Sequence, residues 1–267
     1  LPAGTLVPAF EVLDATHKGV IDGGHTAAAY WVGKHRAAAL FGPAPGGPFG
    51  MDTVDLMGWL YEGGGLELWK ELYQVELKRN VIPLPLTAVN NQVLGWFKNP
   101  VTKLEDLKGL KYRTVGISID VFTGMGSAVN ALPGGEIVSA MDRGLLDAAE
   151  FNNASSDRAL GFPDVSKVCM LQSYHQNAEQ FEILFNKTKY DALPARMKAI
   201  IENGVEAASQ DLVWKSIDRY SKDYIEMRTK DKVNFYKTPA SILQAQLTAY
   251  DGVANKKAAE NPLFKEI

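Results

Sequence analysis

One stretch of the sequence, residues 194–230, restricts the possible folds more than any other. Its apolar side chains recur at intervals of three and four residues, which predicts a single long amphipathic helix. At a rise of 1.5 Å per residue this helix would extend for about 50 Å, more than one small lobe needs. We therefore expect two lobes that share the helix. Its apolar positions are Met197, Ile200, Ile201, Val205, Ala208, Leu212, Ile217, Tyr220, Tyr224 and Met227.

The length and composition are those of a globular protein with one large domain or two lobes. Of its 267 residues, 46% are hydrophobic and 22% are charged, which allows a sizeable core. The net charge is −3 and the basic residues are scattered, so nothing favours a nucleic-acid partner or an anionic membrane surface. The single cysteine, Cys169, excludes an internal disulfide, and no apolar run approaches the roughly 20 residues that span a bilayer. No signal peptide is visible, and the first residues look like those of a mature or trimmed product.

Strand-like and helix-like segments alternate through most of the chain, and this alternation indicates parallel βαβ units. In such sheets ligands collect at the carboxyl ends of the strands. Pro83 and Pro85 argue against a central position for their strand. Strands are predicted near residues 20–26, 81–90, 145–153, 166–176 and 179–186, and helices near 8–18, 53–62, 66–77, 117–132 and 133–144.

An arginine, Arg113, lies on a strand that should be largely buried. The preceding segment predicts a short helix that Thr102 caps, with Glu105 in the capping box, and that Gly109 ends. A buried arginine needs a partner, and its planar fork of donors suits a carboxylate held by two hydrogen bonds. The sequence leaves two readings open: an internal pair with an Asp or Glu, or a bound ligand carboxylate.

Other polar groups also stand at predicted strand ends. They are Gln92, Glu150, the main chain of Phe151, and Gln176. Amide, carbonyl and carboxylate oxygens are ligands that Na⁺ and Ca²⁺ prefer. A ligand held by Arg113 would then bridge the guanidinium and the cation. The alternative is that Glu150 pairs with Arg113 and the amides cap helices.

Signatures of catalysis are weak in this chain. It has no GxSxG, HExxH or P-loop motif, and no GxGxxG follows a strand. The four histidines, His17, His25, His35 and His175, are far apart, and only His175 shares a strand end with other polar groups. The alternative function is a metal-assisted enzyme in which Glu150 acts as base and His175 as acid on a small carbonyl acid.

Several segments resemble one known family. LPAGTLVPAFEVLDATHKGVIDGGH, YEGGGLELWKELY, GWFKNPVTKLEDLKGLKYR and PGGEIVSAMDRGLLDAAEFN are similar to segments of the solute-binding proteins of tripartite ATP-independent periplasmic (TRAP) transporters, the DctP family. The similarity covers most of the chain and keeps the family's order of segments. It is closest to the branch that binds 2-oxo acids.

The resemblance implies an α/β, two-lobed periplasmic-binding-protein fold with hinge-crossing strands and a long lobe-spanning helix. Residues 1–88 plus 151–178 are expected in lobe I, and residues 89–150 plus 179–195 in lobe II. Residues 196–230 form the spanning helix, and residues 231–267 a C-terminal helical segment that packs on lobe I. The family's first strand and helix precede the LPAG segment, so we expect either that the first lobe lacks this element or that the chain has been trimmed.

The resemblance also implies a periplasmic receptor, not an enzyme. It binds a small organic monocarboxylate, a 2-oxo acid or a 2-hydroxy acid, and delivers it to TRAP membrane subunits, with a homodimer as a further expectation. A Na⁺ or Ca²⁺ ion would bridge protein and ligand through Gln92, Glu150, the Phe151 carbonyl and Gln176. The substrate-binding residues carried over are Arg113, Gln92, Phe151, Asn152, His175 and Tyr30. Phe151 replaces a common Trp, and YHQN replaces a Pro-Gly-Trp run, so the substrate can differ while the carboxylate clamp stays.

Overall fold

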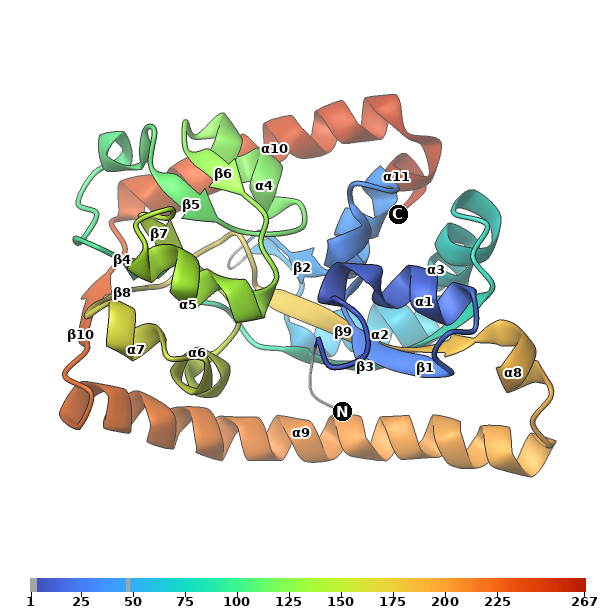
Figure 1. The fold of residues 1–267 in the computed structure, drawn as a ribbon. Helices are drawn as coiled ribbons and strands as arrows, with labels where there is room; N and C mark the ends of the chain where they lie inside the picture. Colours follow the sequence, from blue (N-terminus) through green and yellow to red (C-terminus); the bar gives the residue numbers. More distant parts are fainter. Residues whose placement is uncertain (1–3, 47–48) are drawn as a thin grey trace.

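Two lobes lie side by side along one long helix in the computed structural model, which describes residues 4–46 and 49–267. The helix is α9, Ala195–Thr229, and it runs beneath both lobes in Figure 1. On the opposite side α10, Ala240–Glu260, passes over both lobes (Figure 1). Among the described residues, every helix is too short or too polar to cross a bilayer.

The first lobe is built on an antiparallel sheet around β9 (Ala178–Asn186). Strands β1 (Gly23–Thr26) and β2 (Pro43–Ala44) pair with different parts of β9, and β3 (Val81–Val89) pairs along most of its length. Among the described strands β3 pairs only with β9, so the prediction that its prolines exclude a central position is confirmed. The outer side of β3 lies against α9, where the Thr87 amide donates to Ser209 Oγ over 3.0 Å.

The second lobe is built on a mixed sheet with the order β10-β8-β4-β7-β5-β6. The pairs β5/β6, β5/β7 and β8/β10 are parallel, whereas β4 runs antiparallel to both neighbours. The predicted parallel units therefore describe part of this sheet and none of the first. Alternation of strands and helices indicates that strands exist, but it does not specify their direction. The strands are β4 Gly95–Phe97, β5 Lys111–Arg113, β6 Ala128–Asn130, β7 Ala148–Ala149, β8 Val168–Leu171 and β10 Asn234–Lys237.

Short helices cover the sheets and close the cores. In the first lobe a cluster around Trp31, Trp69 and Phe41 fills the space between the sheet and its helices. Asp52 caps α2 in a capping box with Asp55, as predicted. The remaining helices are α1 Val12–His17, α2 Thr53–Glu62, α3 Gly65–Glu71, α4 Ser118–Gly124, α5 Gly134–Asp142, α6 Ala154–Leu160, α7 Phe162–Val165, α8 Lys187–Asp191 and α11 Pro262–Glu266, the 3-10 turns η1 Ala9–Glu11, η2 Ala28–Trp31, η3 Arg36–Phe41 and η6 Leu104–Leu107, and the π-helical η5 Leu72–Glu76.

The prediction of one helix over residues 117–132 is wrong. Helix α4 ends at Gly124, and Gly126 has a φ of +94°, a left-handed conformation that glycine adopts without strain. The chain then forms β6, which pairs with β5. The predicted helix near residue 104 is a single 3-10 turn, and its capping carboxylate is that of Asp106, which accepts hydrogen bonds from Thr102 and Lys103.

The predicted lobe boundaries differ from the strand pairing at two places. Strand β8 lies within residues 151–178, predicted in lobe I, but belongs to the second sheet; β9 lies almost entirely within residues 179–195, predicted in lobe II, but belongs to the first. The chain therefore crosses between the sheets at residues 172–177, in the opposite sense to the prediction. The C-terminal segment also contributes to both lobes, because β10 joins the second sheet while α11 packs into the first core.

The long helix has the predicted position, but its inner face is polar. Its buried residues are Ser209, Ser216, Asp223 and Met227, whereas Ile200 is 55% exposed. Small and charged side chains suit this face because α9 lies against a strand backbone in one lobe and a salt-bridged helix, α6, in the other.

Candidate ligand-binding site

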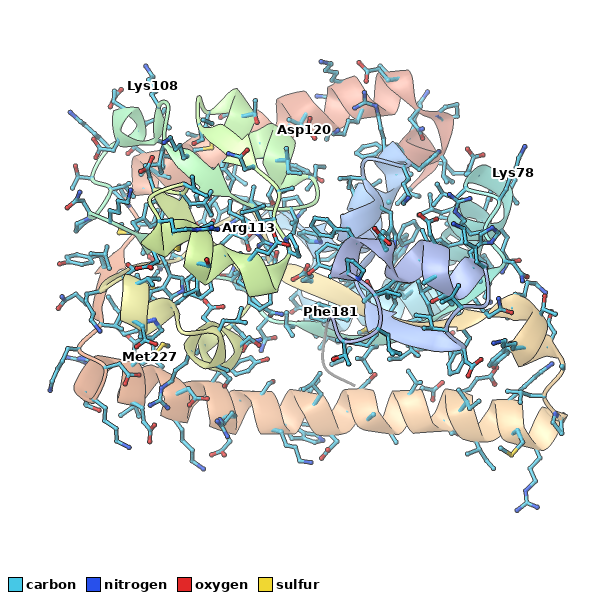
Figure 2. The ribbon with its side chains drawn as sticks, viewed as in Figure 1. Lys78, Lys108, Arg113, Asp120, Phe181 and Met227 are labelled. Atoms are coloured by element: carbon cyan, nitrogen blue, oxygen red, sulfur yellow. The ribbon has the colours of Figure 1, made fainter. Side chains whose placement is uncertain are left out.

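Arg113 is the last residue of β5, and its guanidinium is almost completely buried. Figure 2 shows its side chain inside the second lobe. Nε donates to the Leu132 carbonyl over 2.9 Å, and Nη1 donates to both the carbonyl and Oε1 of Glu150, over 2.8 and 2.9 Å. Within residues 4–46 and 49–267, Nη2 makes no hydrogen bond. One amino group of the fork is therefore available to a ligand.

Glu150 follows β7 directly and forms the ion pair with Arg113. Both side chains are at most 2% exposed, so this pair is desolvated. Burial raises the pKa of the Glu150 carboxyl, while the Arg113 charge and a hydrogen bond from Gln92 act in the opposite direction. Of the two partners that the sequence left open for Arg113, an internal carboxylate or a ligand carboxylate, the internal one is present in this conformation.

Gln92 lies just before β4 and joins the same cluster. Its Nε2 donates to Glu150 Oε2, and its main-chain amide donates to the Gln176 carbonyl over 3.1 Å. Its Oε1 is buried and has no partner in the described part of the chain. A buried acceptor without a partner costs free energy, so this oxygen is suited to a cation or to a donor on a ligand.

A second buried acid, Glu179, faces the cluster from the start of β9. Its Oε2 accepts a hydrogen bond from Gln176 Nε2 over 3.2 Å. Burial, together with the charge of Glu150, raises the pKa of Glu179 to about 8. Sequence reasoning missed this residue, although a glutamate on a strand predicted to be buried was a usable signal.

Phe151 and Asn152 lie beside the cluster in different ways. The Phe151 ring is 5.8 Å from the Arg113 guanidinium carbon and packs on Gly134, where a Cβ would overlap it. Asn152 uses its side chain locally, because its Oδ1 accepts from Asn153 Nδ2 over 2.8 Å. The Phe151 ring therefore lines the site beside Arg113, whereas Asn152 is held by its main-chain amide, which donates to Asp157.

Tyr30 belongs to the first lobe, on η2. Burial raises the pKa of its phenol. The charge of Arg113 lowers this pKa, whereas the charges of Glu179 and Glu150 raise it further, so the hydroxyl is close enough to the cluster to feel its charges. The site thus draws residues from both lobes, since Arg113 and Glu150 belong to the second.

His175 is buried away from these charges. Its Nδ1 is hydrogen-bonded to Ser173 Oγ, and its ring packs edge-on against Phe122, with 5.4 Å between centroids. Burial lowers the pKa of His175 to about 3, so the imidazole is neutral at ordinary pH. Its described contacts join it to Ser173 and Phe122 and not to Glu150.

The cluster holds two carboxyl groups, those of Glu150 and Glu179, against a single guanidinium. Within the described ranges, no group of three or more His, Cys, Asp or Glu side chains is arranged to hold a metal ion. A cation at this site would therefore depend on amide and main-chain oxygens in addition to Glu150. The unpartnered Gln92 Oε1 is such an oxygen.

Residues 1–261 match the family described as bacterial extracellular solute-binding protein, family 7, or DctP. The chain belongs to the DctP family. The family predicted from the sequence is therefore confirmed. Curated relatives include a monocarboxylate 2-oxoacid-binding periplasmic protein of Nostoc, 30% identical over 265 residues, which cover 99% of this chain and 71% of the relative.

Solved structures of TRAP transporter solute-binding proteins share the fold. One from Bordetella bronchiseptica has a TM-score of 0.93 at 25% identity, covering 100% of this chain and 77% of its own, and is described as a dimer with calcium and picolinate in one site. One from Colwellia psychrerythraea, with calcium and pyruvate, has a TM-score of 0.87 at 28% identity, and the match covers 96% of this chain and 76% of the Colwellia chain. One from Pseudoalteromonas atlantica, with sodium and pyruvate, has a TM-score of 0.88 at 26% identity, and the match covers 96% of this chain and 76% of the Pseudoalteromonas chain. The predicted two-lobed α/β fold is thus confirmed.

Proposed function

We propose that this protein is a periplasmic receptor that binds a small organic monocarboxylate and delivers it to the membrane subunits of a TRAP transporter. The observation that carries the proposal is the desolvated Arg113, whose Nη2 has no partner among the described residues. The 2-oxo acids are the substrate class that the Nostoc relative's name gives. A 2-oxo or 2-hydroxy acid offers a carboxylate for the guanidinium and a second oxygen for a cation.

Charge balance supports a Na⁺ or Ca²⁺ ion in the same site. An entering carboxylate adds a second negative charge beside Glu150, against the single positive charge of Arg113. We infer that Glu150 then turns from Arg113 to the cation, which releases Nη1 for the ligand. Gln92 Oε1, Glu150, the Phe151 carbonyl and Gln176 would hold the ion, which supplies a Lewis acid for the ligand oxygens.

Closure of the two lobes would complete the site. Arg113, Gln92 and Glu150 come from the second lobe, while Tyr30 and the β9 residue Glu179 come from the first. Because the guanidinium is only 1% exposed, a ligand reaches it when the lobes separate. Closure then excludes water, which strengthens each charged contact.

Arg113→Ala tests the proposal most directly. We expect the affinity for pyruvate in the presence of Ca²⁺ to fall by roughly 2–5 kcal/mol, because a buried charged partner is lost. Isothermal titration calorimetry measures this change. Arg143→Ala, which removes an arginine from the exposed end of α5, is the matched control.

Arg113→Lys separates binding from folding. It keeps a cation beside Glu150 but removes the planar fork, so it should fold and still bind weakly. Unchanged affinity in both Arg113 variants would refute the assignment. Mass spectrometry of the small molecule released from denatured protein would identify the acid itself.

The enzyme alternative has little support from the site. A histidine whose pKa is about 3 is a neutral imidazole at neutral pH and lacks the imidazolium proton that a general acid donates, and His175 lies against Ser173 and Phe122. We propose that the bound acid is returned unchanged. Conversion of pyruvate during long incubation with Ca²⁺ would argue for the enzyme instead. A homodimer stays a prediction, which sedimentation equilibrium would check.

A further inference from the structure

Asp157 is a buried carboxyl group next to the site that no predicted role uses. It lies on α6, between α5 and α9 in Figure 1, and is 2% exposed. Its Oδ2 accepts from Trp96 Nε1 over 2.8 Å, and its Oδ1 accepts from the Asn152 main-chain amide over 3.1 Å. Neither partner is a cation, and burial raises the pKa of Asp157 to about 7. Burying a carboxyl group in this way costs stability.

Capping of α6 does not account for Asp157. Asn153 already caps this helix, because its side-chain oxygen accepts from the amides of Ser155 and Ser156. The neighbouring Arg158 forms its ion pairs with Asp223, Glu226 and Asp231 and leaves Asp157 alone. The carboxyl group of Asp157 therefore accepts hydrogen bonds from the Asn152 amide and from Trp96, and the Asn153 amide also stabilises its charged form.

The Asn152 amide belongs to the same peptide group as the Phe151 carbonyl. In a trans peptide the N–H and C=O bonds point in opposite directions, so fixing one fixes the other. Asp157 holds the N–H from the α6 side, which directs the carbonyl away from α6. The second carboxyl oxygen is anchored on Trp96, whose strand pairs with Ala149 of β7 just before Glu150.

We propose that Asp157 is a positioning residue that orients the Phe151–Asn152 peptide so that the Phe151 carbonyl serves the cation of the ligand site. The inference rests on the proposed function. Outer hydrogen bonds of this kind orient metal ligands, and their loss commonly costs about 10–100-fold in metal affinity. Asp157 itself contacts neither the ion nor the acid.

The test uses the single acceptor oxygen of an amide. In Asp157→Asn one carboxyl oxygen is replaced by an NH₂ group, which must face either the Asn152 N–H or the Trp96 N–H. One of the two hydrogen bonds is then lost, and two N–H donors point at each other. We expect the affinity for Ca²⁺, measured by calorimetry with pyruvate present, to fall about tenfold. Adding Trp96→Phe removes the indole N–H, and the amide can then turn its oxygen to Asn152. The double variant should regain most of the lost affinity.

A merely structural role gives the opposite pattern. Trp96→Phe removes buried volume, so the double variant would be less stable than Asp157→Asn and would bind no better. Urea denaturation without the ion measures stability separately from affinity. If Asp157→Asn alone does not fold, Trp96→Phe is compared with the double variant, where equal affinity supports the proposal and lost affinity overturns it.

The outcomes also separate this inference from the proposed function. If the unaltered protein binds neither Ca²⁺ nor pyruvate, the proposed function fails and the inference fails with it. If it binds both and Asp157→Asn binds them equally well, only the positioning role is overturned. A failed rescue in the double variant likewise overturns the positioning role alone.

Discussion

Glu182 makes the stability of the first lobe depend on pH. This residue of β9 is fully buried, and its Oε1 accepts hydrogen bonds from Tyr73 Oη over 2.6 Å and Trp31 Nε1 over 3.4 Å. Its Oε2 has no partner in the part of the chain that the structure describes. Burial raises the pKa of Glu182 to about 8, from an ordinary value of 4.5. The group is therefore protonated in the folded protein at neutral pH and ionised in the unfolded chain.

The sign of the effect follows from proton binding. Between pH 5 and pH 8 the folded state holds one more proton at Glu182 than the unfolded state, so stability falls as the pH rises. The unfolding free energy falls by about 1.4 kcal/mol per pH unit, and this fall ends above a pH of about 8. Glu182→Gln keeps the size of the protonated acid and does not ionise. We expect the unfolding free energy of Glu182→Gln to match that of the unaltered protein near pH 5 and to exceed it by about 4 kcal/mol at pH 8.

Urea denaturation of both proteins from pH 5 to pH 8.5 measures the difference in unfolding free energy. Other buried groups titrate in the same range, but they are shared by both proteins and cancel in this difference. Glu62→Gln, the same change at an exposed position on α2, is the control. A difference between Glu182→Gln and the unaltered protein that does not change with pH would refute the reasoning.

Two further predictions concern the site. Removing Ca²⁺ and Na⁺ should weaken pyruvate binding by at least about tenfold, or roughly 1.4 kcal/mol, because the ligand loses its bridging charge; full affinity by calorimetry in ion-free buffer would exclude the ion. Gly134→Ala should lower the unfolding free energy by about 1–3 kcal/mol and weaken binding, because its Cβ would overlap the Phe151 ring. The neighbouring Gly135 has open space around it, so Gly135→Ala should leave stability equal or slightly higher in thermal unfolding.

The long helix and the core of the site could be predicted because each has a local signal. The spacing of apolar residues over 194–230 indicated α9, and strand-end polar groups indicated Arg113, Gln92 and Glu150. These three side chains are joined by hydrogen bonds in the structure. The face that α9 buries had no such signal, because it contacts its neighbours through Ser209 and Asp223.

Pairing between distant strands could not be predicted. Residues 166–171 and 179–186 both have the composition of buried strands, but composition does not say which sheet each joins. The crossing near residues 172–177 was therefore predicted in the wrong direction: the chain passes from the second lobe to the first. Glu179 was missed for a related reason, since its strand was interpreted only as an apolar element. In the fold this strand starts at the ligand site and ends in the first core.

The two attachments of α9 constrain how the lobes can separate. Ser209 binds the backbone of β3 in the first lobe, and Asp223 binds Ser155 and Arg158 in the second. These attachments are about 21 Å apart along the helix axis, a distance that a rigid helix keeps constant. Helix α10 packs on both cores on the opposite side, so opening must be a rotation that keeps both helices attached to both lobes. Spin labels at the two ends of α9 should keep their distance when ligand is removed, whereas a pair with one label on each lobe should move apart.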